Sequence, residues 1–275
     1  MPVREIDPLI THETVVSGSR MKALTSPQNP LIKGLRRALA SGGLTDDGFC
    51  VIEGFHLLEE AIKSGCEIGP VFATSRSLPL VTERQGVYEL PDKIFAQISS
   101  TQTPQGIVAL VKPPAWTLQQ TLGGISLAVI LDGIQEPGNA GAIVRAAEAF
   151  GGSGAVFLKG TVNPFNPKCL RASAGSLFRL PMVYGVEEES FWAAAGENGL
   201  AVYAAMPLGS TLLGSAGLTG PCAFIIGSEG RGVRPEISAR AKGLRIPTAG
   251  VESLNAAVAA GILLYEARRQ RAKQP

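Results

Sequence analysis

Three loops of the sequence combine glycines with amides, hydroxyls and charged groups, the residue types that bind ligands and align reacting atoms. They are DGIQEPGNAGAIVR (132–145), GSEGRGV (227–233) and IPTAGVESLN (246–255). Each follows or includes a short apolar run of the kind that forms a buried strand. Because ligands of open parallel sheets bind outside the carboxyl ends of the strands, these loops are predicted to form one site.

The first loop leads into a helix that carries an unusual arginine. Asn139 is expected to be the N-cap, with small residues filling the first turn. Arg145 lies six residues on, roughly 9 Å along the helix axis. Helical side chains lean toward the N-terminus, so its guanidinium can return to the loop end of the sheet. The alternative is that Asn139 only caps and Arg145 is a surface charge, but an arginine among packing residues favours a function.

The second loop places an acid between glycines. Gly227, Gly230 and Gly232 permit positive φ and close approach of the backbone to a ligand. Glu229 can accept hydrogen bonds at the end of the sheet or help to hold Arg145. A tight turn alone would explain the glycines but not the acid.

The third loop has more polar groups than a helix start requires. Ser253 and Asn255 flank Leu254 just before an apolar helix. Either side chain can serve as the N-cap and one suffices. At least one of the two is therefore expected to be free for a ligand.

Several other kinds of site are not supported. The P-loop string GxxxxGK[ST] is missing from the sequence, and the turn after the first strand of the longer series lacks GxGxxG, which argues against ATP and NAD. The cysteines are far apart, with no CxxC pair, so neither a metal site nor a disulfide framework is predicted. A reducing cytoplasm fits this cysteine usage best. They are Cys50, Cys66, Cys169 and Cys222.

The elements that position these loops belong to an α/β protein with two domains. The chain has 275 residues, 45% of them hydrophobic, and a net charge of only +2, so any basic surface must come from local clustering. Residues 1–20 are expected to be a loose tail. Residues 21–112 alternate short strands and helices, which predicts a small α/β/α sandwich. Residues 113–124 are rich in Pro, Gly and Gln and are predicted to be a linker.

Residues 125–275 alternate apolar strands with helices in a longer series. Strands without polar alternation predict a parallel sheet that is covered on both faces. The longest uncharged run, 199–228, is broken by prolines and glycines, so no membrane span is predicted. The N-terminus lacks a signal-peptide pattern, and a soluble intracellular protein is expected.

Together, NAGAIVRAAEAFG, FIIGSEGRGV and IPTAGVESLNAAVAAGILLYE resemble the three motifs of the SpoU (TrmH-like) branch of the SPOUT RNA methyltransferases. The resemblance covers residues 125–275. Residues 21–112 resemble the ribosomal-protein-like RNA-binding domain that precedes the catalytic domain in rRNA-directed members. Thr248 stands where the family usually has Met, and AAVAAG replaces a more usual VSVA.

The resemblance implies a catalytic SPOUT domain whose C-terminal segment forms a deep trefoil knot, a rare exception among folds. It implies that S-adenosylmethionine is the cofactor and that the enzyme is a homodimer whose site is completed by the partner subunit. By motif position, the cofactor-binding residues are Ala205, Gly227, Ile246 and Leu254.

The reaction implied is methyl transfer to a ribose 2′-hydroxyl of RNA. The implied catalytic residues are Asn139, Arg145, Glu229, Ser253 and Asn255. A guanidinium stays protonated, so Arg145 is expected to bind a phosphate and stabilise the developing alkoxide, while Ser253 and Asn255 orient the ribose.

A basic helix is expected to contact the RNA. It carries Lys33, Arg36 and Arg37, although a solvated helix face would look the same. The C-terminal Arg268, Arg269, Arg271 and Lys273 could contribute, but a solvated helix end explains them as well. The two-domain layout favours rRNA as substrate. The alternatives are a tRNA 2′-O-methyltransferase and a non-catalytic RNA-binding factor on the same fold.

Overall fold

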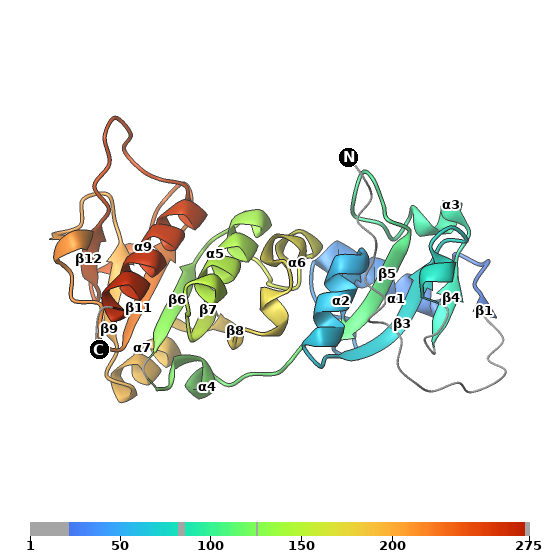
Figure 1. Ribbon diagram of the computed structural model, residues 1–275, viewed down its shortest axis with the longest axis horizontal. Coiled ribbons are helices and arrows are strands. Elements are labelled where there is room, and N and C mark those ends of the chain that lie inside the picture. Colours follow the sequence, from blue (N-terminus) through green and yellow to red (C-terminus); the bar gives the residue numbers. More distant parts are fainter. Residues whose placement is uncertain (1–21, 82–85, 125, 273–275) are drawn as a thin grey trace.

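The structure is a computed structural model that describes residues 22–81, 86–124 and 126–272. The predicted tail and Lys273 lie outside these ranges. Two sheets, each with its own helices, lie side by side along the long axis of the molecule (Figure 1). Within the described ranges, the helices are all too short or too polar to cross a membrane.

The first sheet has five strands in the order β1-β4-β3-β5-β2. Strand β5 runs antiparallel to its neighbours β2 and β3, while β3, β4 and β1 are parallel. The strands are β1 (Lys22–Ala23), β2 (Cys50–Glu53), β3 (Glu67–Ala73), β4 (Val87–Glu89) and β5 (Ile107–Lys112). The helices are α1 (Pro30–Ser41), α2 (Phe55–Lys63) and α3 (Asp92–Phe95).

Helices cover both faces of the first sheet because its strands alternate their side chains between two apolar clusters. Val51 packs in the cluster that includes Ile32 and Leu35 of α1, whereas its neighbour Ile52 packs in the cluster that includes Leu57 of α2. Helix α1 begins where Asn29 accepts a hydrogen bond from the Leu31 amide at 2.9 Å. The expected α/β/α arrangement is present.

The second sheet has seven parallel strands in the order β10-β12-β9-β11-β6-β7-β8, as a parallel sheet was predicted. The strands are β6 (Leu127–Asp132), β7 (Gly154–Leu158), β8 (Met182–Val186), β9 (Ala201–Ala205), β10 (Thr211–Leu212), β11 (Cys222–Gly227) and β12 (Lys242–Arg245). The helices are α4 (Leu118–Leu122), α5 (Pro137–Ala149), α6 (Pro167–Ser173), α7 (Glu188–Glu197), α8 (Pro235–Ser238) and α9 (Ala256–Arg271).

The central strands of this sheet are buried on both faces. In β6, Val129 packs in the cluster that contains α5, α6 and α9, and Ile130 packs in the cluster that contains α4, α7 and α8. Such two-sided burial explains why these strands lack the polar alternation of a half-exposed strand. All strands end at one edge, so the loops after them meet there.

Two segments differ from the sequence expectations. Residues 118–122 of the predicted linker form α4, whose Thr117 and Gln120 make a capping box and whose Leu122 is fully buried beside α7. The sequence also predicts a helix over residues 94–100 (IFAQISS), but only Ile94 and Phe95 of that stretch are helical, at the end of α3. Residues 118–122 are helical despite their loop-like composition because the capping box at Thr117 starts the helix.

Side chains join the two halves of the molecule. Arg179 donates to Glu148 on α5 at 2.6 Å and forms an ion pair with Glu60 on α2. Arg171 on α6 donates to the hydroxyl of Ser100 at 2.7 Å. Helices α5 and α6 of the second half are thereby tied to the first half.

Candidate functional site

The three polar loops meet at the carboxyl edge of the second sheet. Strand β11 lies beside β6 with Gly227 opposite Asp132, so their following loops begin side by side. Strand β9 lies on the other side of β11, with Ala205 opposite Leu244 of β12. The loop after β11 therefore stands between the loop after β6 and the segment that leads from β12 to α9.

A chain of hydrogen bonds connects one side chain from each loop. Asn255 is the N-cap of α9 and its Oδ1 accepts from the amides of Ala257 at 3.0 Å and Val258 at 3.3 Å. Its Nδ2 donates to Oδ1 of Asn139 at 3.1 Å. The Nδ2 of Asn139 donates to Oε1 of Glu229 at 2.8 Å. The cap fixes which way the Asn255 amide faces, and each later donor follows from that choice.

Asn139 was expected to be an N-cap, and this prediction is wrong. Helix α5 begins two residues earlier, at Pro137, and Glu136 caps it by accepting from the Gly138 amide at 3.2 Å. Proline suits the first helical position because its missing N–H is not needed there. Asn139 lies in the first turn instead, where its side chain is free to join Asn255 to Glu229.

The remaining predicted catalytic residues are exposed. Ser253 forms no hydrogen bond, and Arg145 no hydrogen bond or ion pair, with any residue in the described ranges. Glu229 was expected either to accept hydrogen bonds at the end of the sheet or to hold Arg145. In the structure it accepts a hydrogen bond from Asn139. Since Asn255 is the cap, Ser253 is the side chain left without a local partner.

The residues predicted to bind a cofactor lie near the hydrogen bonds that join Asn255, Asn139 and Glu229. Ala205, Ile246 and Leu254 are half-buried at the ends of β9 and β12 and at the start of α9. Gly227 must be glycine, because a Cβ there would lie 2.0 Å from the carbonyl carbon of Gly232. This close return of the chain leaves backbone and half-buried apolar groups at one edge, which fits a ligand with an apolar ring and polar ends. Thr248 donates to the Val251 carbonyl within the same segment.

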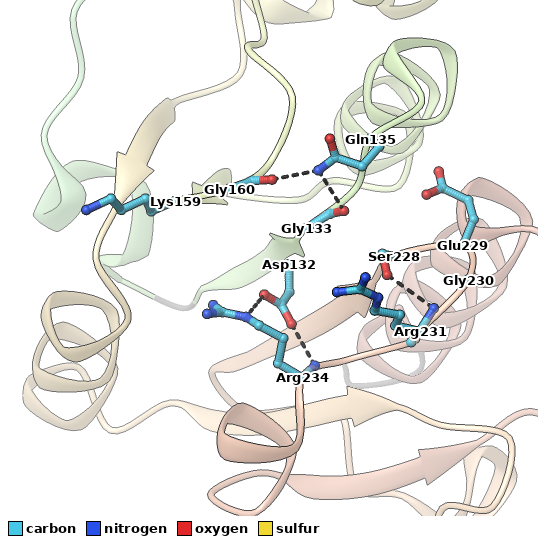
Figure 2. A pocket seen from close by; sticks show the side chains of 11 residues that line it. Asp132, Gly133, Gln135, Lys159, Gly160, Ser228, Glu229, Gly230, Arg231 and Arg234 are labelled. Carbon is cyan, nitrogen blue, oxygen red and sulfur yellow. Dashed lines mark hydrogen bonds and ion pairs between the residues drawn. The ribbon is translucent and has the colours of Figure 1, made fainter.

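A cavity of about 630 Å³ lies beside the β11 loop. It lies between the loops after β6, β7 and β11, and Glu229 is the only predicted site residue among the described residues of its wall (Figure 2). The other side chains in this wall were not predicted from the sequence. Among them are Asp132, Gln135, Lys159, Ser228, Arg231 and Arg234. Lys159 and Ser228 directly follow the apolar strands β7 and β11, and that position is the sequence signal that could have found these two.

An ion pair between a buried carboxylate and a partly exposed arginine lies in the wall of this cavity. Asp132 has a fully buried side chain and accepts from Nε of Arg234 at 2.7 Å and from its backbone amide at 2.8 Å. The two bonds fix the start of α8 against the end of β6. Within the described part of the chain, no cluster of three metal-ligating side chains is present.

The basic helix α1 lines a second cavity, of about 500 Å³. Lys33, Arg36 and Arg37 lie on its wall with Gln28 and Pro30. Arg36 donates to Gln97, and Arg37 lies 3.4 Å from Asp46. The three cations thus share one surface.

Sequence comparison covers both halves of the chain. Residues 126–265 match the SpoU rRNA Methylase family, and residues 29–109 match the MRM3-like substrate binding domain. An uncharacterized tRNA/rRNA methyltransferase of Synechocystis sp. is 34% identical over 92% of this chain and 96% of its own. The 23S rRNA (guanosine(2553)-2′-O)-methyltransferase RlmP of Bacillus subtilis is 30% identical over 90% of this chain and 100% of its own.

A solved structure has the same two-part architecture. The crystal structure of an AdoMet-bound rRNA methyltransferase from Sinorhizobium meliloti superposes with a TM-score of 0.78 and 29% identity. It covers 90% of this chain and 98% of that chain. The similarity therefore extends over both sheets.

Proposed function

The chain belongs to the SpoU rRNA methylase family, and we propose that it transfers a methyl group from S-adenosylmethionine to a ribose 2′-hydroxyl of rRNA. The observation that carries this proposal is the Glu229–Asn139–Asn255 chain, which gathers the three predicted loops at one point. The three loops that resemble the family's motifs are far apart in the sequence, and these hydrogen bonds join them at one place.

The proposed catalytic roles follow from which groups are already occupied. The side-chain amides of Asn139 and Asn255 are hydrogen-bonded to each other, to Glu229 and to the first turn of α9. These two residues are therefore proposed to hold the geometry of the catalytic centre. Ser253 has a free hydroxyl and is proposed to orient the ribose. Arg145 retains a free guanidinium, and we assign it to the adjacent phosphate and the developing alkoxide.

The cofactor is proposed to lie against Ala205, Gly227, Ile246 and Leu254. When bound, S-adenosylmethionine supplies a methyl group that its sulfonium has already activated. The protein must therefore mainly align an in-line attack and support a poor nucleophile. The knotted path of the C-terminal segment is part of this proposal. It is supported by α9, which returns from β12 to pack against α5, β11 and β6.

A second copy of the chain is proposed to complete the site. Helix α9 exposes Val258 by 51% and Tyr265 by 55%, seven residues apart and hence on one face. Arg145 is on the neighbouring helix α5, six residues and about 240° around the axis from Asn139. It therefore points away from its own Asn139 and is proposed to serve the partner's site across this face.

The first half, residues 21–112, is proposed to hold the RNA, with residues 113–117 and α4 connecting it to the catalytic half. The match to a substrate binding domain and the cations that line the α1 cavity support this role. Cytoplasmic action is proposed because all four cysteines are free thiols.

Methyl transfer to purified RNA tests the proposal. The protein is incubated with labelled S-adenosylmethionine and with rRNA or tRNA from a strain that lacks the gene. The products are then digested with nucleases and examined by mass spectrometry. We expect one new 2′-O-methylated nucleotide in rRNA. Labelled tRNA alone would favour the tRNA alternative, and no transfer together with no calorimetric heat from the cofactor would leave only an RNA-binding factor.

A further inference from the structure

The cavity beside the β11 loop shares a wall with the centre proposed for catalysis. Glu229 accepts a hydrogen bond from Asn139 and also lines the cavity. The loop is closed on itself by the reciprocal bonds between Ser228 and Gly232, at 3.0 and 2.9 Å. A ribose held near Glu229 and Ser253 would thus have its attached groups directly at the mouth of the cavity.

The cavity presents a mixture of free donors and acceptors. Gln135 uses Nε2 to donate to the carbonyls of Gly160 at 2.6 Å and Gly133 at 3.1 Å, which leaves Oε1 as an acceptor (Figure 2). Ser228 accepts from the Arg231 amide at 3.3 Å and retains its hydroxyl proton. The guanidinium of Arg231 has no partner in the described part of the chain, and its five donors remain available.

The charges on the wall do not suit a phosphate. Lys159 is paired with Glu187 at 2.6 Å, and Arg234 is paired with Asp132 at 2.7 Å. Arg231 is therefore the only unneutralised cation among the described lining residues, and Glu229 faces the same space. A cavity of about 630 Å³ also lies in the range of sites for small organic ligands.

We propose that this cavity receives the nucleobase of the target nucleotide, turned out of its stack, and that Arg231 and Gln135 read its edge. The inference rests on the proposed function. A base and its ribose are joined by one glycosidic bond, so a ribose at Glu229 places the base next to that residue. The planar fork of Arg231 can donate to two adjacent acceptors of a base edge, and Oε1 of Gln135 can accept from a base N–H. Arg231 is thus a specificity-determining residue.

A cycle that combines a protein variant with a base deletion tests this inference. The target nucleotide is first mapped in rRNA as described above. Two RNA fragments are then compared, one intact and one with an abasic ribonucleotide that keeps its 2′-hydroxyl at the target position. We expect Arg231→Ala to lower kcat/KM on the intact fragment by roughly 10- to 100-fold. On the abasic fragment, the same variant should cause no further loss.

Two further variants separate base reading from generic charge. Arg231→Lys keeps the charge but loses the planar fork, so it should behave like Arg231→Ala. Arg240→Ala removes an exposed arginine just before the start of β12, at the edge of the second sheet opposite the cavity, and should leave kcat/KM unchanged.

Two results would overturn the base pocket but not the proposed function. One is that Arg231→Ala lowers kcat/KM on the abasic fragment by the same factor as on the intact fragment. The other is near-normal activity of Arg231→Lys. Either would indicate a backbone contact. No methylation by the unaltered protein would instead remove the proposed function, and the base pocket with it.

Discussion

The side-chain amide of Asn255 donates to Oδ1 of Asn139 at 3.1 Å, across 116 positions of sequence. The bond joins the first turn of α5 to the N-cap of α9. Because the same Asn255 side chain caps α9, its orientation is set before any substrate arrives. The geometry of the proposed centre therefore depends on the start of a helix.

Replacing Asn255 should separate the cap from the hydrogen-bond chain. Asn255→Ala removes both and should cost about 1 kcal/mol of stability. Asn255→Asp keeps a good capping oxygen but loses the donor to Asn139. We expect thermal unfolding of the aspartate variant to match that of the unaltered protein while methyl transfer falls in both variants. Full activity of Asn255→Asp would show that the bond to Asn139 is dispensable.

Ser253 is expected to affect the reaction and not the fold. Its side chain is exposed and has no described partner, so Ser253→Ala should change stability by less than about 0.5 kcal/mol. Loss of a group that orients the ribose should lower kcat by the order of 100-fold. The matched control is Ser215→Ala, an exposed serine beside the other end of α9. Equal activity of both variants would contradict the role given to Ser253.

Arg145 is expected to act through the shape of its guanidinium as well as its charge. Arg145→Lys retains the charge but loses the planar fork that binds phosphate with two bonds. We expect kcat/KM for rRNA to fall by at least about 10-fold, with the thermal midpoint unchanged because the side chain is exposed. Near-normal turnover in steady-state assays would rule out the phosphate clamp.

Helix α1 should bind RNA mainly through phosphates. Replacing Lys33 or Arg37 by Ala should weaken rRNA binding and reduce the slope of log K against log salt by about 0.7 to 0.9 for each phosphate that is no longer neutralised. The measurement is a filter-binding titration at several salt concentrations. Lys63→Ala, on α2 at the opposite face of the first sheet, is the control and should leave the slope unchanged. Identical slopes for all variants would place the RNA elsewhere.

Glu53 should make the first half of the molecule sensitive to acid. Burial opposes its ionisation, but donors from Ser99, Thr101 and Ser100 outweigh burial and hold the pKa of the carboxyl below its usual value. The carboxylate therefore stabilises the fold above its unfolded pKa of about 4.3, and this contribution disappears as pH falls through the lower folded pKa. Glu53→Gln should cost about 1–3 kcal/mol at pH 7.

Chemical unfolding of both proteins between pH 7 and pH 3 measures this effect. The difference in the free energy of unfolding should shrink as the pH approaches 3. A difference that stays constant would mean that the loss in Glu53→Gln comes from packing and not from the charge.

The sequence predicted the buried strands well because both faces of the second sheet are covered. Strand β11 is a continuous run without a charged residue, and β6 is apolar up to its last residue, Asp132; such short runs are typical of strands that are buried on both faces. The strands β1 and β10 have only two residues each and carry no periodicity to detect. They form because β1 pairs with the edge of β4 and β10 pairs with the edge of β12.

The start of α5 shows why a cap could be misplaced. Both Glu136-Pro137 and Asn139 carry plausible start signals, and the proline decided the matter by fitting the first helical position. The cavity beside Arg231 could not be predicted at all. Its walls come from loops that are neighbours only through the strand order β11-β6-β7, and sequence order does not contain that information.

The ties of Arg179 to Glu60 on α2 and to Glu148 on α5 give the molecule a fixed internal span. Helix α5 carries Asn139 and Arg145, and the unit of α2 carries the basic helix α1. An RNA gripped at α1 would then offer to the distant edge only nucleotides that lie one set length away. Under the proposed function, the distance between α1 and the α5 end of the site is then a second selection criterion, in addition to the base contacts proposed for Arg231.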